Sequence, residues 1–146
     1  MEYLTYKSMA RVAPGSAACR DIVTVSQRNN AGLGLTGFLH AEDGLFIQYL
    51  EGPSRPLWTL YERLHLDPRH EDLVLLGHGD ARKRRFRDWR LGYSEAGVLS
   101  FADFLEEVSV VQPGEQTSGL AAIMFLMAAS TRIDLGIADA PQSAWH

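Results

Sequence analysis

The sequence lacks the features that mark secreted, membrane-spanning and metal-binding proteins. Its one cysteine, Cys19, cannot form an intramolecular disulfide, so nothing supports an oxidising compartment. The longest apolar run, residues 120–129, is too short to cross a bilayer, and the N-terminus has no signal-peptide pattern. The five histidines are scattered, and no CxxC, HExxH or P-loop motif is present. We therefore expect a cytoplasmic protein without a metal site.

Positive charge is also in short supply. The net charge is −4 over 146 residues, whereas non-specific binding to nucleic acid or to an anionic membrane needs a basic surface. The composition, 46% hydrophobic and 22% charged, fits one globular domain with a few accessory elements. We expect neither nucleic acid nor membrane as a partner.

What the sequence does contain is an alternation of strand-like and helix-like segments over its first 95 residues. The predicted elements are a strand at 2–10, a helix at 16–30, strands at 35–41 and 45–51, a helix at 53–67, and strands at 72–79 and 86–94. This order predicts an α+β fold, a ferredoxin-like β-α-β-β-α-β sandwich with an added strand and C-terminal helices.

The character of the chain changes after Ser100. Residues 100–111 have helical periodicity, residues 112–119 read as a linker, and residues 120–133 form an almost uncharged helix. Such an apolar helix must bury most of its surface. We therefore divide the chain into a domain at 1–96 and a helical extension at 97–146. The extension is a cap, a dimer surface or a partner surface, and a cap on the far face of the sheet is the favoured interpretation.

Several polar residues occupy apolar settings. Gln48 lies between Phe46 and Leu50 on one face of its strand, and burying its amide without partners costs about 1–3 kcal/mol. Each such residue has an ordinary explanation as a core tyrosine, a helix cap, a cross-strand pair or a surface salt bridge. Together they fall at the ends or inner faces of elements that can surround one slot between the first two helices. The set comprises Tyr6, Ser8, Asn29, Asn30, Gln48, Asp67, Arg69 and His70.

In register, these residues resemble the BLUF family, the blue-light sensors that use FAD. The resemblance covers roughly residues 2–95. It rests on YKS at 6–8, NN at 29–30, GLTGFL at 34–39, FIQYLEG at 46–52, DPRH at 67–70 and RRFRDW at 84–89.

The resemblance implies a flavin ring held between the two helices and assigns a role to each matching position. Tyr6 is the photochemical electron and proton donor, and Gln48 lies between Tyr6 and the N5/O4 edge of the flavin. Asn30 bonds the C4 carbonyl and N3 region, and Trp89 relays the signal. Asp67, Arg69 and His70 line the ring from the end of the second helix. The pocket wall comprises Ser8, Met9, Ile22, Ser26, Asn29 and Phe46.

The chemistry of these residues suits that role. A tyrosine can reduce an excited flavin, and its acidic radical cation then loses a proton, which the amide of Gln48 can carry. After charge recombination a rotated or tautomerised Gln48 would donate to flavin O4 and shift the absorption to the red. No covalent bond to flavin is required, and Cys19 reads as a small apolar side chain.

Two positions limit the resemblance. Leu91 stands where many family members have methionine, so a signalling step through that sulfur does not transfer. The basic run at 82–87 could meet the diphosphate of FAD, but a solvated strand edge is the favoured interpretation.

The predicted output is contact with an unidentified signalling protein, because about 50 residues after the sensor cannot hold a cyclase or a phosphodiesterase. For the same reason we expect no enzymatic activity. The route would run from Gln48 through the sheet to Trp89 and then into the C-terminal helices. A homodimer or higher oligomer stays open. The alternatives are an acylphosphatase-like hydrolase, with Arg11 and Asn29 or Asn30 in its site, and a flavin-free interaction module. Retention of both Tyr6 and Gln48 counts against the flavin-free module.

Overall fold

The computed structural model describes residues 1–87, 89–109 and 118–136. The strands are β1 (Glu2–Ala10), β2 (Thr36–Glu42), β3 (Leu45–Gly52), β4 (His70–Asp80) and β5 (Gly92–Glu95). The helices are α1 (Ala17–Leu33), α2 (Ser54–Leu66), α3 (Phe101–Ser109) and α4 (Gly119–Asp134).

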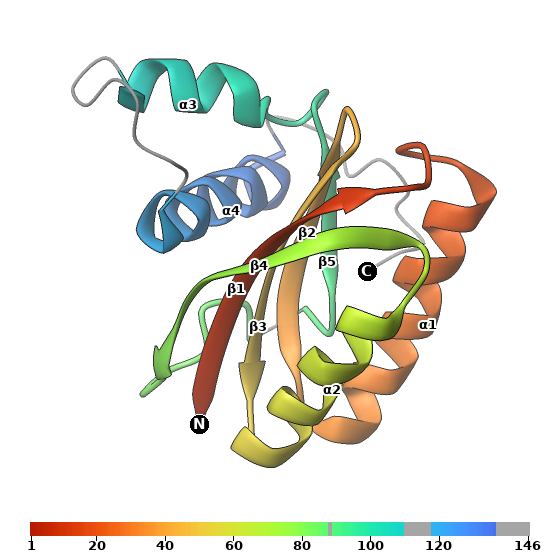
Figure 1. Cartoon of the computed structure of the whole chain (residues 1–146). Helices are drawn as coiled ribbons and strands as arrows, with labels where there is room; N and C mark the ends of the chain where they lie inside the picture. Colours follow the sequence, from red (N-terminus) through yellow and green to blue (C-terminus); the bar gives the residue numbers. More distant parts are fainter. Residues whose placement is uncertain (88, 110–117, 137–146) are drawn as a thin grey trace.

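The five strands form one sheet in the order β4-β1-β3-β2-β5. β1 and β2 both pair antiparallel with β3, β4 pairs antiparallel with β1, and β5 is added parallel to β2 at the edge. α1 and α2 lie on one side of the sheet, and α3 and α4 lie on the other (Figure 1). The predicted ferredoxin-like fold with an added strand is confirmed.

β3 lies inside the sheet and is buried on both faces, as its sequence predicts. Phe46 and Leu50 join the core beneath α1 and α2, whereas Ile47 and Tyr49 join a second core beneath α4. Side chains alternate between the faces of a strand, so Gln48 shares the face of Phe46 and Leu50.

α1 is longer than predicted. Ser16 caps it by accepting a hydrogen bond from the backbone N–H of Cys19, but the helix continues past Asn30 to Leu33. Gly34 then adopts a left-handed conformation (φ 70°), and its N–H bonds to the carbonyl of Asn30. Gly34 accepts this conformation without strain, so the helix ends there. Asn30 therefore lies within the last turns of the helix.

The strand predicted at 86–94 begins too early, because β5 begins only at Gly92. The backbone N–H groups of Arg85 and Phe86 donate to the carboxylate of Glu51, each at 2.8 Å, instead of joining a ladder. The preceding basic residues thus lie in the β4–β5 connection and not along a strand edge.

Trp89 consequently does not share a face with Leu91 and Tyr93, as the predicted strand would require. It packs beside Phe38 in the core beneath α4, with ring centroids 5.1 Å apart, whereas Leu91 and Tyr93 belong to the core beneath α1 and α2. Asp88, predicted on the face of Phe86, lies outside the described residues.

The C-terminal extension begins with α3 and continues with α4. Ala122, Phe125 and Leu126 of α4 pack against the sheet in the same core as Phe38 and Ile47, so α4 covers the far face. Most of the predicted linker and the tail beyond residue 136 lie outside the described residues, and the boundary at 96/97 stays a prediction. No helix in the described ranges has the length and apolar character needed to span a membrane.

Candidate functional site

A cavity of about 180 Å³ lies between α1, α2 and the sheet, and it brings together most of the predicted site residues. It is smaller than the ~300–1,000 Å³ of typical sites for drug-sized ligands, so it suits a ring system better than a whole dinucleotide. The residues that line it are Tyr6, Ile22, Val25, Ser26, Asn29, Asn30, Leu39, Phe46, Gln48, Leu60, Arg63, Leu64, Asp67, Arg69 and His70.

Tyr6 and Gln48 lie opposite each other in the β1–β3 ladder, and both face this cavity. The hydroxyl of Tyr6 donates a hydrogen bond to Oε1 of Gln48. Burial raises the pKa of Tyr6 above its usual range, and the negative charge of Asp67 adds to the effect, so the phenol keeps its proton. Among the described residues Nε2 of Gln48 has no protein acceptor, which leaves this donor for a ligand.

Asn30 supplies the matching acceptor. Its Nδ2 donates to the backbone carbonyl of Arg90 at 2.8 Å, but its buried Oδ1 has no hydrogen-bond partner in the described part of the chain. A buried acceptor without a partner costs about 1–3 kcal/mol. Because Asn30 lines the cavity, a ligand N–H such as the imide of a flavin ring would satisfy this oxygen.

His70 holds the wall of the cavity together. Its Nε2 lies 2.6 Å from the carbonyl oxygen of Leu64, which can only accept, so Nε2 carries the proton. Nδ1 is then free to accept from the hydroxyl of Ser8 at 2.7 Å. These bonds place the imidazole 6.2 Å from the ring of Tyr6 and 6.3 Å from that of Phe46, measured between centroids.

Asp67 and Arg69 form a compact ion pair at the C-terminal end of α2. The guanidinium of Arg69 donates to Asp67 Oδ2 at 2.7 Å, and its backbone N–H donates to Oδ1 at 2.9 Å. The side-chain hydrogen bond from Arg69 holds the pKa of the Asp67 carboxyl below its ordinary value. The pair therefore stays charged at neutral pH at the edge of the cavity.

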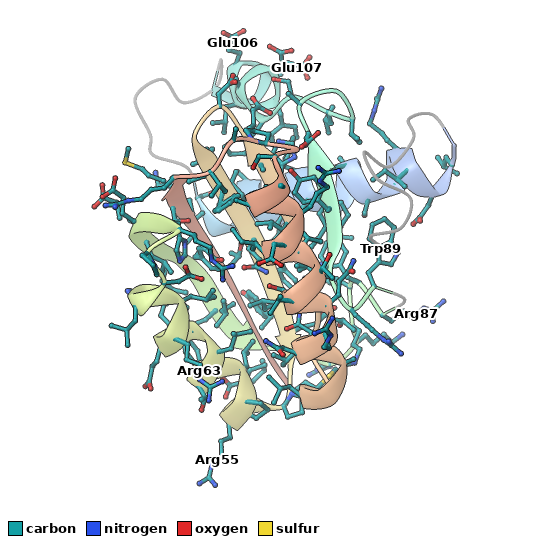
Figure 2. The ribbon with its side chains drawn as sticks, turned by 90° about the vertical axis from the view of Figure 1, so that its right-hand side faces the viewer. Arg55, Arg63, Arg87, Trp89, Glu106 and Glu107 are labelled. Carbon is teal, nitrogen blue, oxygen red and sulfur yellow. The ribbon has the colours of Figure 1, made fainter. Side chains whose placement is uncertain are left out.

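Three predicted site residues do not line the cavity. Ser8 is hydrogen-bonded to His70, which lines the cavity, whereas Met9 is 51% exposed. Trp89 lies on the other side of the sheet, well separated from Arg63 of the cavity (Figure 2). The other predicted site residues do line it: Tyr6, Ile22, Ser26, Asn29, Asn30, Phe46, Gln48, Asp67, Arg69 and His70.

Five lining residues were not predicted. They come mainly from α2. The helical spacing of Leu60 and Leu64 in the sequence indicates a buried face, but it does not indicate that part of this face borders a ligand cavity. Arg63 shares that face because residues at i, i+3 and i+4 are neighbours on a helix. The five are Val25, Leu39, Leu60, Arg63 and Leu64.

Several other candidates lie apart from the cavity. The thiol of Cys19 is buried 3.3 Å from the hydroxyl of Tyr93, and Arg11 pairs with Glu71 at 2.5 Å on the surface. Arg84 of the basic run donates to the carbonyl of Gly34 and does not face the cavity. Within the described ranges no cluster of three or more His, Cys, Asp and Glu side chains could hold a metal ion.

Comparisons with known proteins agree on one family. Residues 1–92 match the family model described as BLUF, sensors of blue-light using FAD. The chain is 33% identical over 106 residues to the photoactivated adenylate cyclase subunit beta of Euglena longa, covering 72% of this chain and 12% of that protein. It is 32% identical over 83 residues to the blue light- and temperature-regulated antirepressor BluF of Escherichia coli (strain K12), covering 57% of this chain and 21% of the antirepressor.

Solved structures show the same fold. The dark-state structure of the BLUF protein BlrB superimposes with a TM-score of 0.71 at 29% identity, covering 88% of this chain and 96% of BlrB. The photo-activated state of BlsA superimposes with a TM-score of 0.74 over 97% of this chain and 98% of BlsA, and at 23% identity it supports the fold alone.

Proposed function

Because this chain belongs to the BLUF family of blue-light sensors that use flavin, we propose that it is a photoreceptor that binds FAD without a covalent bond. The observation that carries the proposal is the hydrogen bond from Tyr6 to Gln48 at the wall of the cavity. The protein would act as a sensor with no enzymatic activity of its own.

The polar groups around the cavity fit a flavin ring. Asn30 Oδ1 is buried without a donor, Gln48 Nε2 can donate, and the edge of a flavin ring offers a partner for each group. The ring would lie between α1 and α2, with Ile22, Phe46 and Leu60 as apolar contacts. The remainder of FAD would extend beyond the cavity past Arg63, an exposed lining residue that offers positive charge, whereas the charge of Arg69 is paired with Asp67.

Light would act on the pair formed by Tyr6 and Gln48. A bound flavin supplies a ring that absorbs blue light and becomes a strong one-electron oxidant. Tyr6 would give up an electron, and its hydroxyl proton would move to Gln48 Oε1 along the existing hydrogen bond while Gln48 Nε2 releases a proton towards the ring. When the electron and one proton return to Tyr6, Gln48 would be left neutral and either rotated or tautomerised. Its stronger hydrogen bond to the ring carbonyl gives the red-shifted state.

An unidentified signalling protein in the cytoplasm would receive the output. The relatives support signalling in general: one is a photoactivated cyclase subunit and another an antirepressor. The geometry disfavours an acylphosphatase-like site, since Arg11 is paired with Glu71 and does not face Asn29 and Asn30 across the cavity. A flavin-free module would leave Asn30 Oδ1 without a partner.

The test is an absorption spectrum of the purified protein after incubation with FAD, before and after blue light. We expect a yellow protein whose visible bands shift to the red under illumination and return in the dark. A protein that takes up no FAD would support the flavin-free module. A yellow protein with no reversible shift would refute the photochemical role of Tyr6 and Gln48.

A further inference from the structure

Glu42, the last residue of β2, anchors the start of α3. Its side chain is only 6% exposed, and its Oε1 accepts a hydrogen bond from the backbone N–H of Phe101 at 2.8 Å. Its Oε2 accepts from the N–H of Ala102 and from the hydroxyl of Ser100, both at 3.2 Å. A carboxylate at a helix N-terminus satisfies N–H groups that have no partner within the helix and favours the helix dipole.

His40 fixes this carboxylate in place. It is fully buried, and its Nε2 lies 2.9 Å from Glu42 Oε1, an atom that can only accept, so Nε2 carries the proton. Nδ1 then accepts from the hydroxyl of Ser94 on β5 at 2.7 Å. The edge of the imidazole also contacts Phe125 of α4, with ring centroids 4.6 Å apart. His40 thereby joins β2, β5 and both C-terminal helices.

This polar network begins next to the cavity. Leu39 lines the cavity and lies opposite Gln48 in the β2–β3 ladder. His40 is the next residue of β2 and projects to the other face, opposite Ile47. A change at Gln48 that shifts the backbone of β2 would therefore move His40 on the far side of the sheet.

A second buried glutamate makes the same kind of contact with a different segment. Glu51 is fully buried at the end of β3, and it accepts from the N–H groups of Arg85 and Phe86 in the β4–β5 connection. Each carboxylate thus holds two successive backbone N–H groups, but only Glu42 holds α3. Glu51 is therefore a matched control within the same chain.

We propose that Glu42, oriented by His40, is a positioning residue that anchors α3 to the sheet and transmits the change at Gln48 to this helix. The inference rests on the proposed photochemistry. α3 is suited to present the signal because Glu106 and Glu107 project from it away from the rest of the protein (Figure 2).

The test is amide hydrogen exchange of the FAD-loaded protein in the dark and under blue light. In the wild-type protein we expect the amides of Phe101 and Ala102 to exchange faster in the light. Glu42→Gln should raise their dark exchange roughly tenfold, because a charge-assisted bond is lost, and should abolish the light-dark difference. The red shift itself should persist, since Glu42 does not line the cavity.

Two further variants keep the test decisive. Ser100→Ala removes the hydroxyl bond to Glu42 and also the bond that its Oγ accepts from the N–H of Asp103 at 3.3 Å. Its effect on Glu42 is therefore measured at Phe101 and Ala102, whose dark exchange should rise in the same direction even if Glu42→Gln folds poorly. Glu51→Gln should speed exchange at Arg85 and Phe86 and leave the amides of α3 unchanged.

The outcomes separate this inference from the proposed function. If Glu42→Gln or Ser100→Ala keeps the wild-type exchange of α3 in both light and dark, the inference is wrong although the photochemistry stands. If the wild-type protein shows a red shift but no light-dependent exchange in α3, the transmission is refuted. If the wild-type protein shows no red shift, the photochemical proposal fails, and the transmission that rests on it fails too. The dark exchange of wild type and Glu42→Gln then decides only whether Glu42 anchors the helix.

Discussion

The hydroxyl of Tyr6 is hydrogen-bonded to the side-chain oxygen of Gln48, and the two residues are directly opposed in neighbouring strands inside the sheet. Neither strand is at an edge of the sheet, so each is hydrogen-bonded to a neighbouring strand on both sides. This pairing fixes the backbone positions from which the two side chains project. Groups placed on rigid strands hold their geometry better than groups on loops. In the proposed photochemistry, the pair would need no preceding rearrangement of the chain for proton transfer.

Replacing Tyr6 by phenylalanine removes the donor hydroxyl and retains the ring. Tyr6→Phe should bind FAD with an affinity within about tenfold of the wild type, because one neutral hydrogen bond contributes only ~0.5–1.5 kcal/mol. The reversible red shift should disappear, and absorption difference spectra measure it. An unchanged photocycle in the loaded variant would show that Tyr6 is not the donor.

Replacing Gln48 by leucine removes both the acceptor for Tyr6 and the donor for the ligand. Gln48→Leu should stay yellow but lose the reversible red shift. The matched control is Thr5→Val, because Thr5 Oγ1 donates only to the backbone carbonyl of Gln48, at 2.8 Å. A shift of wild-type size in Gln48→Leu would contradict the role of the amide, whereas the control should keep its shift.

Replacing Asn30 by alanine tests the unpaired Oδ1. Asn30→Ala should weaken FAD binding about tenfold or more, since a buried donor on the ligand would lose its acceptor. Titration followed by flavin fluorescence measures the dissociation constant. Gln27→Ala is the control: Gln27 Nε2 donates to the carbonyl of Leu91 at 2.9 Å but does not line the cavity. Equal losses in the two variants would mean that Asn30 acts only by holding the loop at residues 90–91.

The sequence predicts the fold because local patterns determine it, and the resemblance to the BLUF family supplies most of the cavity residues. Strand alternation places Tyr6 and Gln48 on one face, and the helical spacing of Ile22 and Ser26 directs them towards that face. The surroundings of Trp89 could not be predicted in this way. Its strand-like neighbours are held in a turn by Glu51, a contact between residues distant in the sequence.

The same limit explains two other differences. Residues 31–33 are compatible with helix or loop, and only the left-handed Gly34 sets the end of α1. The network of His40 and Glu42 has no sequence motif, because its partners Ser94 and Phe101 arrive from β5 and α3. Such features depend on contacts between distant segments, and the periodicity of the sequence does not reveal these contacts.

Acid should remove the contribution of Asp67 to stability. Because Arg69 lowers the folded-state pKa of this carboxyl below its unfolded value of about 4, the pair stabilises the fold above that pH. The contribution is lost as the pH falls through the folded-state pKa. Asp67→Asn should therefore cost about 1 kcal/mol at pH 7, and the difference from wild type should shrink below about pH 4.

Urea unfolding of the flavin-free protein at several pH values measures this difference. Glu62→Gln on the exposed side of α2 is the control, and its small effect should not follow the same profile. A stability difference for Asp67→Asn that stayed constant from neutral pH into strong acid would contradict the assignment.

Gly92 is required where Trp89 and Phe38 close over the start of β5. A Cβ at this position would lie 1.8 Å from Cε3 of Trp89 and 2.4 Å from Cδ2 of Phe38, both impossibly close. Gly92→Ala should destabilise the protein by about 2–3 kcal/mol, the usual cost of overpacking. Gly97→Ala, where a Cβ meets nothing within 4 Å, is the control and should be close to neutral.

A double-mutant cycle identifies the cause of the destabilisation. In a Trp89→Ala background the cost of Gly92→Ala should fall by about 1 kcal/mol or more, because the nearest ring is gone and only Phe38 remains. Additive costs would mean that Trp89 does not occupy the position beside Gly92, and its packing against the far face of the sheet would then be wrong.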